Sequence, residues 1–302
     1  MGFILLRNTA PPGVLKRSQM QPLFEYETEF NGRRSRVLEL EGEGPPFVLV
    51  HGWSDSADTW RHTLAELGRA DRAAIAVDMP GYGKAAPLEP GEILPQLDDF
   101  LDGVARYAGS GAVFVGNSLG GCASMRLAQR NRRLGGVVAV APAGLDMPRW
   151  FSAIERDPVL RRLVSLPVPL PTAAWRAGVG RVYTTLAFAN PERIEPRVVD
   201  GFTRHLGSRE RVAGILANGR RLLPELKDPF ELERIRTRLL LVWGTADRMV
   251  YPTGAEQVLK TVPGSRLELL EGCGHCPQIE ETSKLTSMML EFAAQRPALR
   301  VA

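Results

Sequence analysis

Short apolar runs alternate with amphipathic stretches over most of the chain. The runs have the length of strands buried on both faces, and we expect strands at 47–50, 73–77, 113–115, 136–140, 238–243 and 266–270. Between them, apolar residues recur at helical spacing. This predicts helices around 60–67 and at 92–108, 122–130, 253–261 and 283–295. Strands that alternate with helices predict an α/β protein whose mostly parallel central sheet is flanked by helices on both faces.

Two segments depart from this alternation. Residues 24–30 and 36–40 have partly alternating patterns around Asn31-Gly32, which predicts an antiparallel hairpin at one edge of the sheet. Between 147 and 226 no strand pattern is found. Four helices broken by prolines are expected there, at 150–164, 172–188, 191–205 and 209–223.

These patterns divide the chain into three parts. Residues 1–22 contain prolines and have no periodicity, so we expect a poorly ordered arm. Residues 23–146 and 227–302 form the predicted core domain. Residues 147–226 are expected to form a helical cap, or lid, inserted into that core.

The composition is that of an ordinary globular protein. The 302 residues are 44% hydrophobic and 24% charged, which suits one large domain with an insertion. No apolar run approaches the roughly 20 residues of a membrane span, and Phe3–Leu6 is too short for the core of a signal peptide. We therefore expect a cytoplasmic protein without stable membrane insertion.

Cysteine usage makes disulfides and metal sites improbable. An odd, small number of cysteines, three, argues against a disulfide framework. Two of them form Cys273-Gly274-His275-Cys276, but the sequence offers no further ligands for a zinc site and no thioredoxin-like context. We expect no metal and no cofactor.

The positive charge is concentrated in the predicted cap. Residues 147–226 hold 13 arginines, no lysine and seven acidic residues, against a net charge of +4 for the whole chain. Such a surplus suits an anionic substrate or an acidic membrane surface, but a solvated arginine-rich surface is the simpler interpretation. No nucleic-acid-binding motif is present. The expected partner is a small molecule, and a homodimer is left open.

Candidate chemistry begins at Gly116-Asn117-Ser118-Leu119-Gly120, where an apolar strand runs into a helix. A sharp strand-to-helix turn strains the residue at its apex and brings the two elements so close that small residues must flank it. The Ser118 hydroxyl then stands clear of the backbone, and the Leu119 amide lies at a helix N-terminus. By itself this five-residue pattern is weak evidence, because an ordinary turn explains it equally well.

Three further residues follow the ends of other predicted strands: Trp53, Asp247 and His275. Ligands of such sheets bind outside the carboxyl ends of the strands. The segments HGW, DMPGYGKA, GNSLGG, GTADRMV and GCGHCPQIE, in this order, resemble those of the α/β-hydrolase fold family, in its serine-nucleophile branch of esterases and lipases with a helical cap. The resemblance covers roughly residues 24–296. Lys84-Ala85 departs from the family pattern, which usually has serine at the second position.

The resemblance implies a catalytic triad of Ser118, His275 and Asp247. A serine hydroxyl needs a base to take its proton, and a histidine oriented by a carboxylate serves that purpose near neutral pH. The backbone amides of Trp53 and Leu119 would form the oxyanion hole, and Gly52 would let that backbone approach the substrate.

Other residues near these segments have simpler interpretations. His51 is expected to support the oxyanion loop, Asp78 to fix a loop, and Asp146 to be the fallback acid of the triad. The expected substrate-binding residues are Gly52, Asn117, Trp150, Phe151 and Trp175; Tyr183 and Phe188 are further aromatic candidates. As a helical stripe, the aromatic residues of the cap are equally well explained as its core.

Serine at the apex narrows the reaction. Haloalkane dehalogenases and epoxide hydrolases of this fold have aspartate there, so acyl transfer is favoured. We rank carboxylic-ester hydrolysis first, because the HGWSDS loop differs from the Ser-Gly-x-Gly-like loop of the hydrolases that cleave carbon–carbon bonds in vinylogous diketo acids. That reaction remains the alternative. A non-catalytic ligand-binding protein on the same fold is a second one, since fold does not determine function.

Overall fold

The computed structural model describes residues 21–148, 172–203 and 208–295. Eight strands form one sheet in the order β1-β2-β4-β3-β5-β6-β7-β8. Only β1–β2 and β2–β4 pair antiparallel, so the expected hairpin is at one edge of a mostly parallel sheet. The strands are β1 Leu23–Phe30, β2 Arg33–Leu40, β3 Glu43–Val50, β4 Arg72–Val77, β5 Val113–Asn117, β6 Gly136–Val140, β7 Leu239–Gly244 and β8 Arg266–Leu270.

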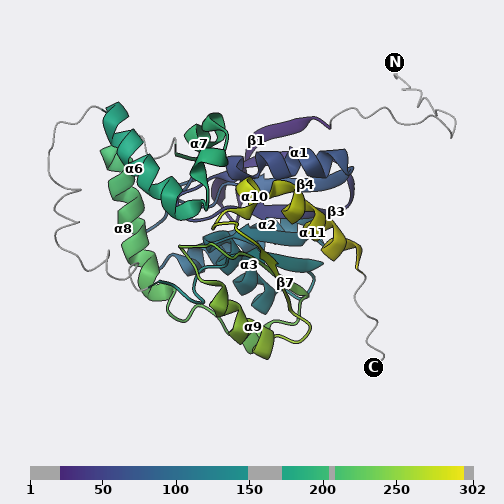
Figure 1. The fold of residues 1–302 in the computed structure, drawn as a ribbon. Helices are drawn as coiled ribbons and strands as arrows, with labels where there is room; N and C mark the ends of the chain where they lie inside the picture. Colours follow the sequence, from purple (N-terminus) through teal and green to yellow (C-terminus); the bar gives the residue numbers. More distant parts are fainter. Residues whose placement is uncertain (1–20, 149–171, 204–207, 296–302) are drawn as a thin grey trace, which may run out of the picture.

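Helices connect the strands and cover both faces of the sheet (Figure 1). They are α1 Arg61–Arg69, α2 Leu94–Ala108, α3 Leu119–Arg130, α6 Thr172–Ala187, α7 Pro196–Thr203, α8 Arg209–Glu225, α9 Ala255–Thr261, α10 Pro277–Glu280 and α11 Thr282–Ala294. Short 3-10 turns at Ala57–Trp60, Pro191–Arg193, Leu232–Arg234 and Pro252–Gly254 complete the described elements. The predicted fold class is therefore confirmed.

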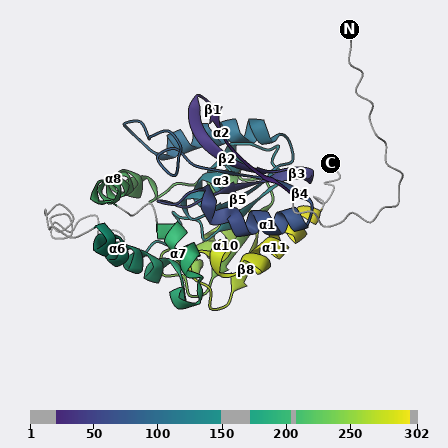
Figure 2. The same ribbon diagram turned by 90° about the horizontal axis from the view of Figure 1, so that it is seen from above.

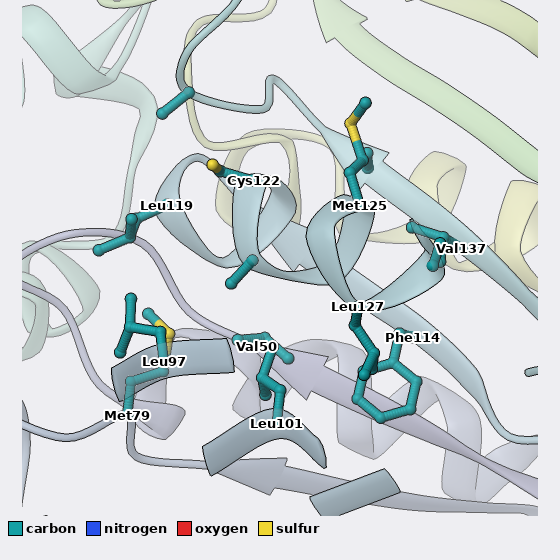
Figure 3. Close-up of a cluster of buried hydrophobic side chains, with 14 of the residues drawn as sticks. Val50, Met79, Leu97, Leu101, Phe114, Leu119, Cys122, Met125, Leu127 and Val137 are labelled. Carbon is teal, nitrogen blue, oxygen red and sulfur yellow. The ribbon is translucent and has the colours of Figure 1, made fainter. Parts of the chain in front are cut away.

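The core consists of two apolar layers, one on each face of the sheet. Helices α2, α3 and α9 pack on one face, and α1 and α11 pack on the other. In the first layer, Phe114 of β5 lies among side chains of α2 and α3 such as Leu101 and Leu127 (Figure 3). Every residue of β5, β6 and β7 is buried, as expected for central strands covered on both faces. These strands fix the positions of the loops that follow them.

Helices α6, α7 and α8 come from the segment between β6 and β7 and lie together on one side of the core (Figures 1 and 2). One prediction for this segment was wrong, because residues 191–205 do not form a single helix. A 3-10 turn ends at Arg193, Ile194 is extended, and α7 begins at Pro196. Proline has no N–H and is favoured in the first turn of a helix over its interior, so Pro196 starts a helix instead of continuing one. The helix expected at 150–164 lies outside the described residues.

Candidate active site

Ser118 occupies the strained turn that its sequence context predicts. Its φ is 53° and its ψ is −115°, a backbone conformation that side chains rarely adopt. Backbone hydrogen bonds hold the turn. The Ser118 N–H donates to the carbonyl oxygen of Val140, and the carbonyl oxygen of Ser118 accepts from the N–H groups of Cys122 and Ala143. Strand β5 thus passes directly into α3, and Ser118 precedes the first residue of that helix.

The flanking glycines are required by close backbone contacts. A Cβ atom on Gly116 would lie 2.2 Å from the Gly120 oxygen, and one on Gly120 would lie 2.3 Å from the Val50 oxygen. No side chain can be placed at such distances without moving backbone. The two glycines therefore allow the strand, the helix and the end of β3 to meet at the serine.

His275 and Asp247 meet at the carboxyl ends of β7 and β8. The His275 Nδ1 lies 2.8 Å from Asp247 Oδ2, and both side chains are buried. The other carboxyl oxygen of Asp247 accepts from the N–H groups of Met249 at 2.7 Å and Val250 at 3.1 Å. A carboxylate only accepts hydrogen bonds, so the neutral imidazole donates to it from Nδ1 and has Nε2 as its acceptor.

The loop that carries His275 is fixed from two sides. Asn117 donates from Nδ2 to the His275 oxygen at 2.9 Å, and the His275 N–H donates to the Ala187 oxygen at the end of α6 at 2.8 Å. Glu280 accepts from the N–H groups of Gly274 at 2.9 Å and Ala189 at 2.8 Å. Burial raises the pKa of the Glu280 carboxyl. These bonds join the histidine to the serine turn and to α6.

The backbone after β3 lies directly beside the serine. A Cβ atom on Gly52 would be 3.3 Å from the Ser118 Cβ, so Gly52 allows this approach. Trp53 follows in the same loop, and Leu119 begins α3. Both residues line the same cavity as Ser118 and His275.

This cavity has an empty volume of about 610 Å³ including its opening. Its floor is formed by the loops at the strand ends, and α6 and α8 contribute an opposing wall. The wall is mostly apolar: Tyr183, Ala187, Gly219, Leu222, Leu223 and Leu226. Helix α8 approaches closely, since a Cβ atom on Gly219 would lie 3.0 Å from the Trp53 ring.

His51 and Asp78 hold the backbone around the site and do not line the cavity. His51 accepts at Nε2 from the Met79 N–H and donates from Nδ1 to the Gly52 oxygen, and burial lowers its pKa. Asp78 fixes its loop by accepting from the N–H groups of Ala57 and Lys84 and by pairing with Arg36 at 2.8 Å. Both residues have the supporting roles expected from the sequence.

The fallback acid and the expected substrate-binding residues differ in how close they lie to the histidine and the cavity. Asp146 accepts from the Thr253 hydroxyl, and the carboxyl beside His275 belongs to Asp247. Asn117 lines the cavity, but its amide is hydrogen-bonded to His275 and Gln278, so it holds the site together. Tyr183 lines the cavity and Phe188 is fully buried. Trp150 and Phe151 lie outside the described residues, as does the side chain of Trp175.

Two acidic residues near the histidine and the serine were not predicted from the sequence. Glu280 organises the histidine loop, and Asp55 lines the cavity only two residues after Trp53. Burial raises the pKa of the Asp55 carboxyl from its usual 3.8 to about 7. The only sequence signal for Asp55 was its place immediately after the HGWS segment.

Metal binding and membrane spanning find no support in the described part of the chain. Among the described residues, no group of three or more histidine, cysteine or acidic side chains is arranged to hold a metal ion. Within the same residues, no helix is both long and apolar enough to cross a membrane.

Comparison with known proteins gives a clear family match. The model of the family described as "Alpha/beta hydrolase family" matches residues 47–286. A pimeloyl-[acyl-carrier protein] methyl ester esterase of Vibrio vulnificus is 24% identical over 260 residues, which cover 85% of this chain and 97% of the esterase. A monoacylglycerol lipase of Xenopus laevis is 24% identical over 264 residues, covering 83% of this chain and 76% of the lipase.

Solved structures show the same fold at low sequence identity. One example is 2-hydroxy-6-oxo-6-phenylhexa-2,4-dienoate hydrolase from Rhodococcus sp. strain RHA1. It superposes with a TM-score of 0.72 and 22% identity, covering 90% of this chain and 99% of that one. At this level of identity the likeness shows the fold alone.

Proposed function

Because the chain belongs to the α/β-hydrolase family, we propose that it is a serine hydrolase that cleaves a carboxylic ester through an acyl-enzyme. The observation that carries this proposal is the 2.8 Å contact between His275 Nδ1 and Asp247 Oδ2, in a cavity that also contains the strained Ser118. An esterase and a lipase among the relatives support the same reaction class.

The proposed reaction has two steps. His275 Nε2 takes the Ser118 proton while Oγ attacks the ester carbonyl; the tetrahedral intermediate then expels the alcohol, which receives that proton. In the second step His275 takes a proton from a water molecule, whose oxygen attacks the acyl-serine. The bond between the acyl carbon and Ser118 Oγ then breaks, the acid is released, and His275 returns the proton to Oγ. Asp247 holds the imidazole in the required tautomer and stabilises the imidazolium.

The negative charge of each intermediate needs preorganised donors. The Trp53 and Leu119 amides are the proposed oxyanion hole, because both residues line the cavity and flank the serine. Removing one such donor typically costs about 3 kcal/mol of transition-state stabilisation. The position of Leu119 at the start of α3 adds the partial positive charge of a helix N-terminus.

The cavity favours an ester over a vinylogous diketo acid. A carboxylate buried against apolar residues requires a cation or several donors as partners. No arginine or lysine is found among the described residues that line the cavity, whereas one additional carboxyl, Asp55, is. The Arg-rich composition of segment 147–226 thus gives no support for an anionic substrate inside this part of the cavity.

We further propose that residues 147–226 form the cap of this enzyme. Helices α6 and α8 supply the apolar wall opposite Ser118, where a hydrocarbon part of the substrate would be removed from water. An apolar wall of this kind fits the acyl chain of an ester.

Turnover of p-nitrophenyl butanoate and of a vinylogous diketo acid tests the proposal. We expect hydrolysis of the ester by the native protein, and its loss in Ser118→Ala without loss of folding. Turnover of the diketo acid alone would show a carbon–carbon hydrolase. Turnover of neither compound, together with tight binding of an ester, would indicate a binding protein.

A further inference from the structure

Asp55 is an acidic side chain in the cavity that the proposed reaction does not use. Only 8% of the residue is exposed, yet it lines the same cavity as Ser118 and His275. Burying a carboxyl in an apolar wall is unfavourable unless it has partners. A carboxylate can accept about four hydrogen bonds, so a carboxyl in the cavity lining that has fewer protein donors can accept a further one from a ligand.

Asp55 is held on the same frame as the proposed triad. Its Oδ1 accepts from the Ser56 N–H at 2.8 Å, and the Thr59 hydroxyl forms a second hydrogen bond with the carboxyl. Gln278 donates to the Thr59 hydroxyl at 3.3 Å and to Asn117 Oδ1 at 3.2 Å. Because Asn117 in turn binds the His275 oxygen, the position of the carboxyl is fixed relative to the histidine loop.

The surroundings of this carboxyl favour positive charge. The described residues lining the cavity contain no arginine or lysine to pair with it. Trp53 and Tyr183 line the same space, and aromatic rings attract cations. Once ionised, above its raised pKa of about 7, the carboxyl would be satisfied by a hydrogen-bond donor on a ligand, and by an ammonium group above all, whereas a ligand carboxylate would be repelled.

We propose that Asp55 is a specificity-determining residue whose carboxyl accepts a hydrogen bond from an ammonium or hydroxyl group of the substrate. It thereby selects esters that carry such a donor over esters whose remaining groups are purely hydrocarbon or include a free carboxylate. This inference rests on the proposed ester hydrolysis and names its substrate class. The bond to Ser56 also suits a purely structural role for Asp55, so the test must separate recognition from folding.

Pairs of esters with matched shapes provide that test. Dimethylaminoethyl hexanoate is compared with 3-methylbutyl hexanoate, and 2-hydroxyethyl hexanoate with propyl hexanoate. Methyl 6-hydroxyhexanoate and methyl heptanoate place the same difference on the acyl side. The variants are Asp55→Ala, Asp55→Asn, which keeps an acceptor for the Ser56 N–H, and the surface control Asp102→Asn, which lies outside the cavity.

For the native protein we expect kcat/KM to be at least about tenfold higher for the donor ester in one or more pairs, the effect of one well-made hydrogen bond. Asp55→Ala should abolish every such preference. Asp55→Asn should abolish the ammonium preference, since an amide has no charge to pair with it, and should retain part of any hydroxyl preference. Each Asp55 variant should lose more kcat/KM on the donor ester than on its hydrocarbon partner, and Asp102→Asn should behave as the native protein.

Two results would overturn the inference while leaving ester hydrolysis intact: equal turnover within every pair by the native protein, or an equal loss on all esters in folded Asp55→Asn. The second would show a structural role. If the native protein hydrolyses none of these esters and Ser118 does not react with a fluorophosphonate, the proposed function fails and this inference fails with it.

Discussion

The imidazole of His275 and the carboxyl of Asp247 are 2.8 Å apart, although 28 residues separate them in the chain. The two residues follow adjacent parallel strands, β7 and β8, whose carboxyl ends lie at the same edge of the sheet. Because a carboxylate only accepts hydrogen bonds, the neutral imidazole donates from Nδ1, and in the proposed reaction Nε2 is the base.

Asp247→Asn should therefore lower kcat for ester hydrolysis by about 10³–10⁴-fold, because an amide favours the wrong tautomer and cannot stabilise the imidazolium. The measurement is steady-state turnover of p-nitrophenyl butanoate. Asp146→Asn is the matched control and should retain native kcat, since Asp146 pairs with Thr253. Loss of activity in Asp146→Asn, with activity retained in Asp247→Asn, would show that Asp247 is not the acid of the triad.

Gly120→Ala should prevent stable folding. The added Cβ would lie 2.3 Å from the Val50 oxygen, a backbone atom that cannot move without displacing β3. Gly178→Ala is the control, because a Cβ there meets nothing within 4 Å in the exposed part of α6. It should stabilise that helix by about 0.5–1 kcal/mol. Circular dichroism and urea unfolding measure both effects, and a normally folded Gly120→Ala would disprove the close approach.

Asp55 should make stability depend on pH. Its pKa rises from 3.8 to about 7 on folding, so the folded state retains a proton that the unfolded state has lost between these values. Stability due to this group therefore falls as the pH rises from about 4 to 7. Asp55→Asn removes the effect. The free energy of unfolding of the variant, minus that of the native protein, should increase by up to about 4 kcal/mol between pH 4 and pH 8. A constant difference over this range would contradict the raised pKa.

The buried pair of Arg36 and Asp78 should be important for stability. Breaking a buried ion pair typically costs about 3–5 kcal/mol. In Asp78→Ala, Arg36 keeps only its more exposed partners Asp58 and Glu25, and the Ala57 and Lys84 N–H groups lose their acceptor. Urea unfolding should show this loss. The exposed pair Arg197–Glu195 is the comparison, and Glu195→Ala should cause no measurable change. Equal behaviour of the two variants would mean that burial of the first pair has little effect.

The sequence predicted the features that depend on local patterns. Strands such as β6 are short continuous apolar runs. The serine turn is marked by two glycines, which are needed because neighbouring backbone lies too close for a side chain. Parallel pairing then brings residues at strand ends together, which is why His275 and Asp247 could be proposed as partners.

Contacts made between distant parts of the chain could not be predicted in this way. Glu280 accepts a hydrogen bond from Ala189, 91 residues away, and Thr59 binds Gln278, 219 residues away. The burial of Asp55 depends on such packing and leaves no periodic trace. The break before α7 was visible in principle, because proline is disfavoured in the interior of a helix and favoured in its first turn.

Reaction of the native protein with a fluorophosphonate tests the central claim most directly. The Ser118 Oγ should displace fluoride from phosphorus. Intact mass spectrometry should then show one phosphonate per chain, and peptide mapping should place it on Ser118. Ser118→Ala should remain unlabelled, and Asp247→Asn should react far more slowly. Failure of the folded native protein to form this adduct, or equal labelling of Ser118→Ala, would contradict the account.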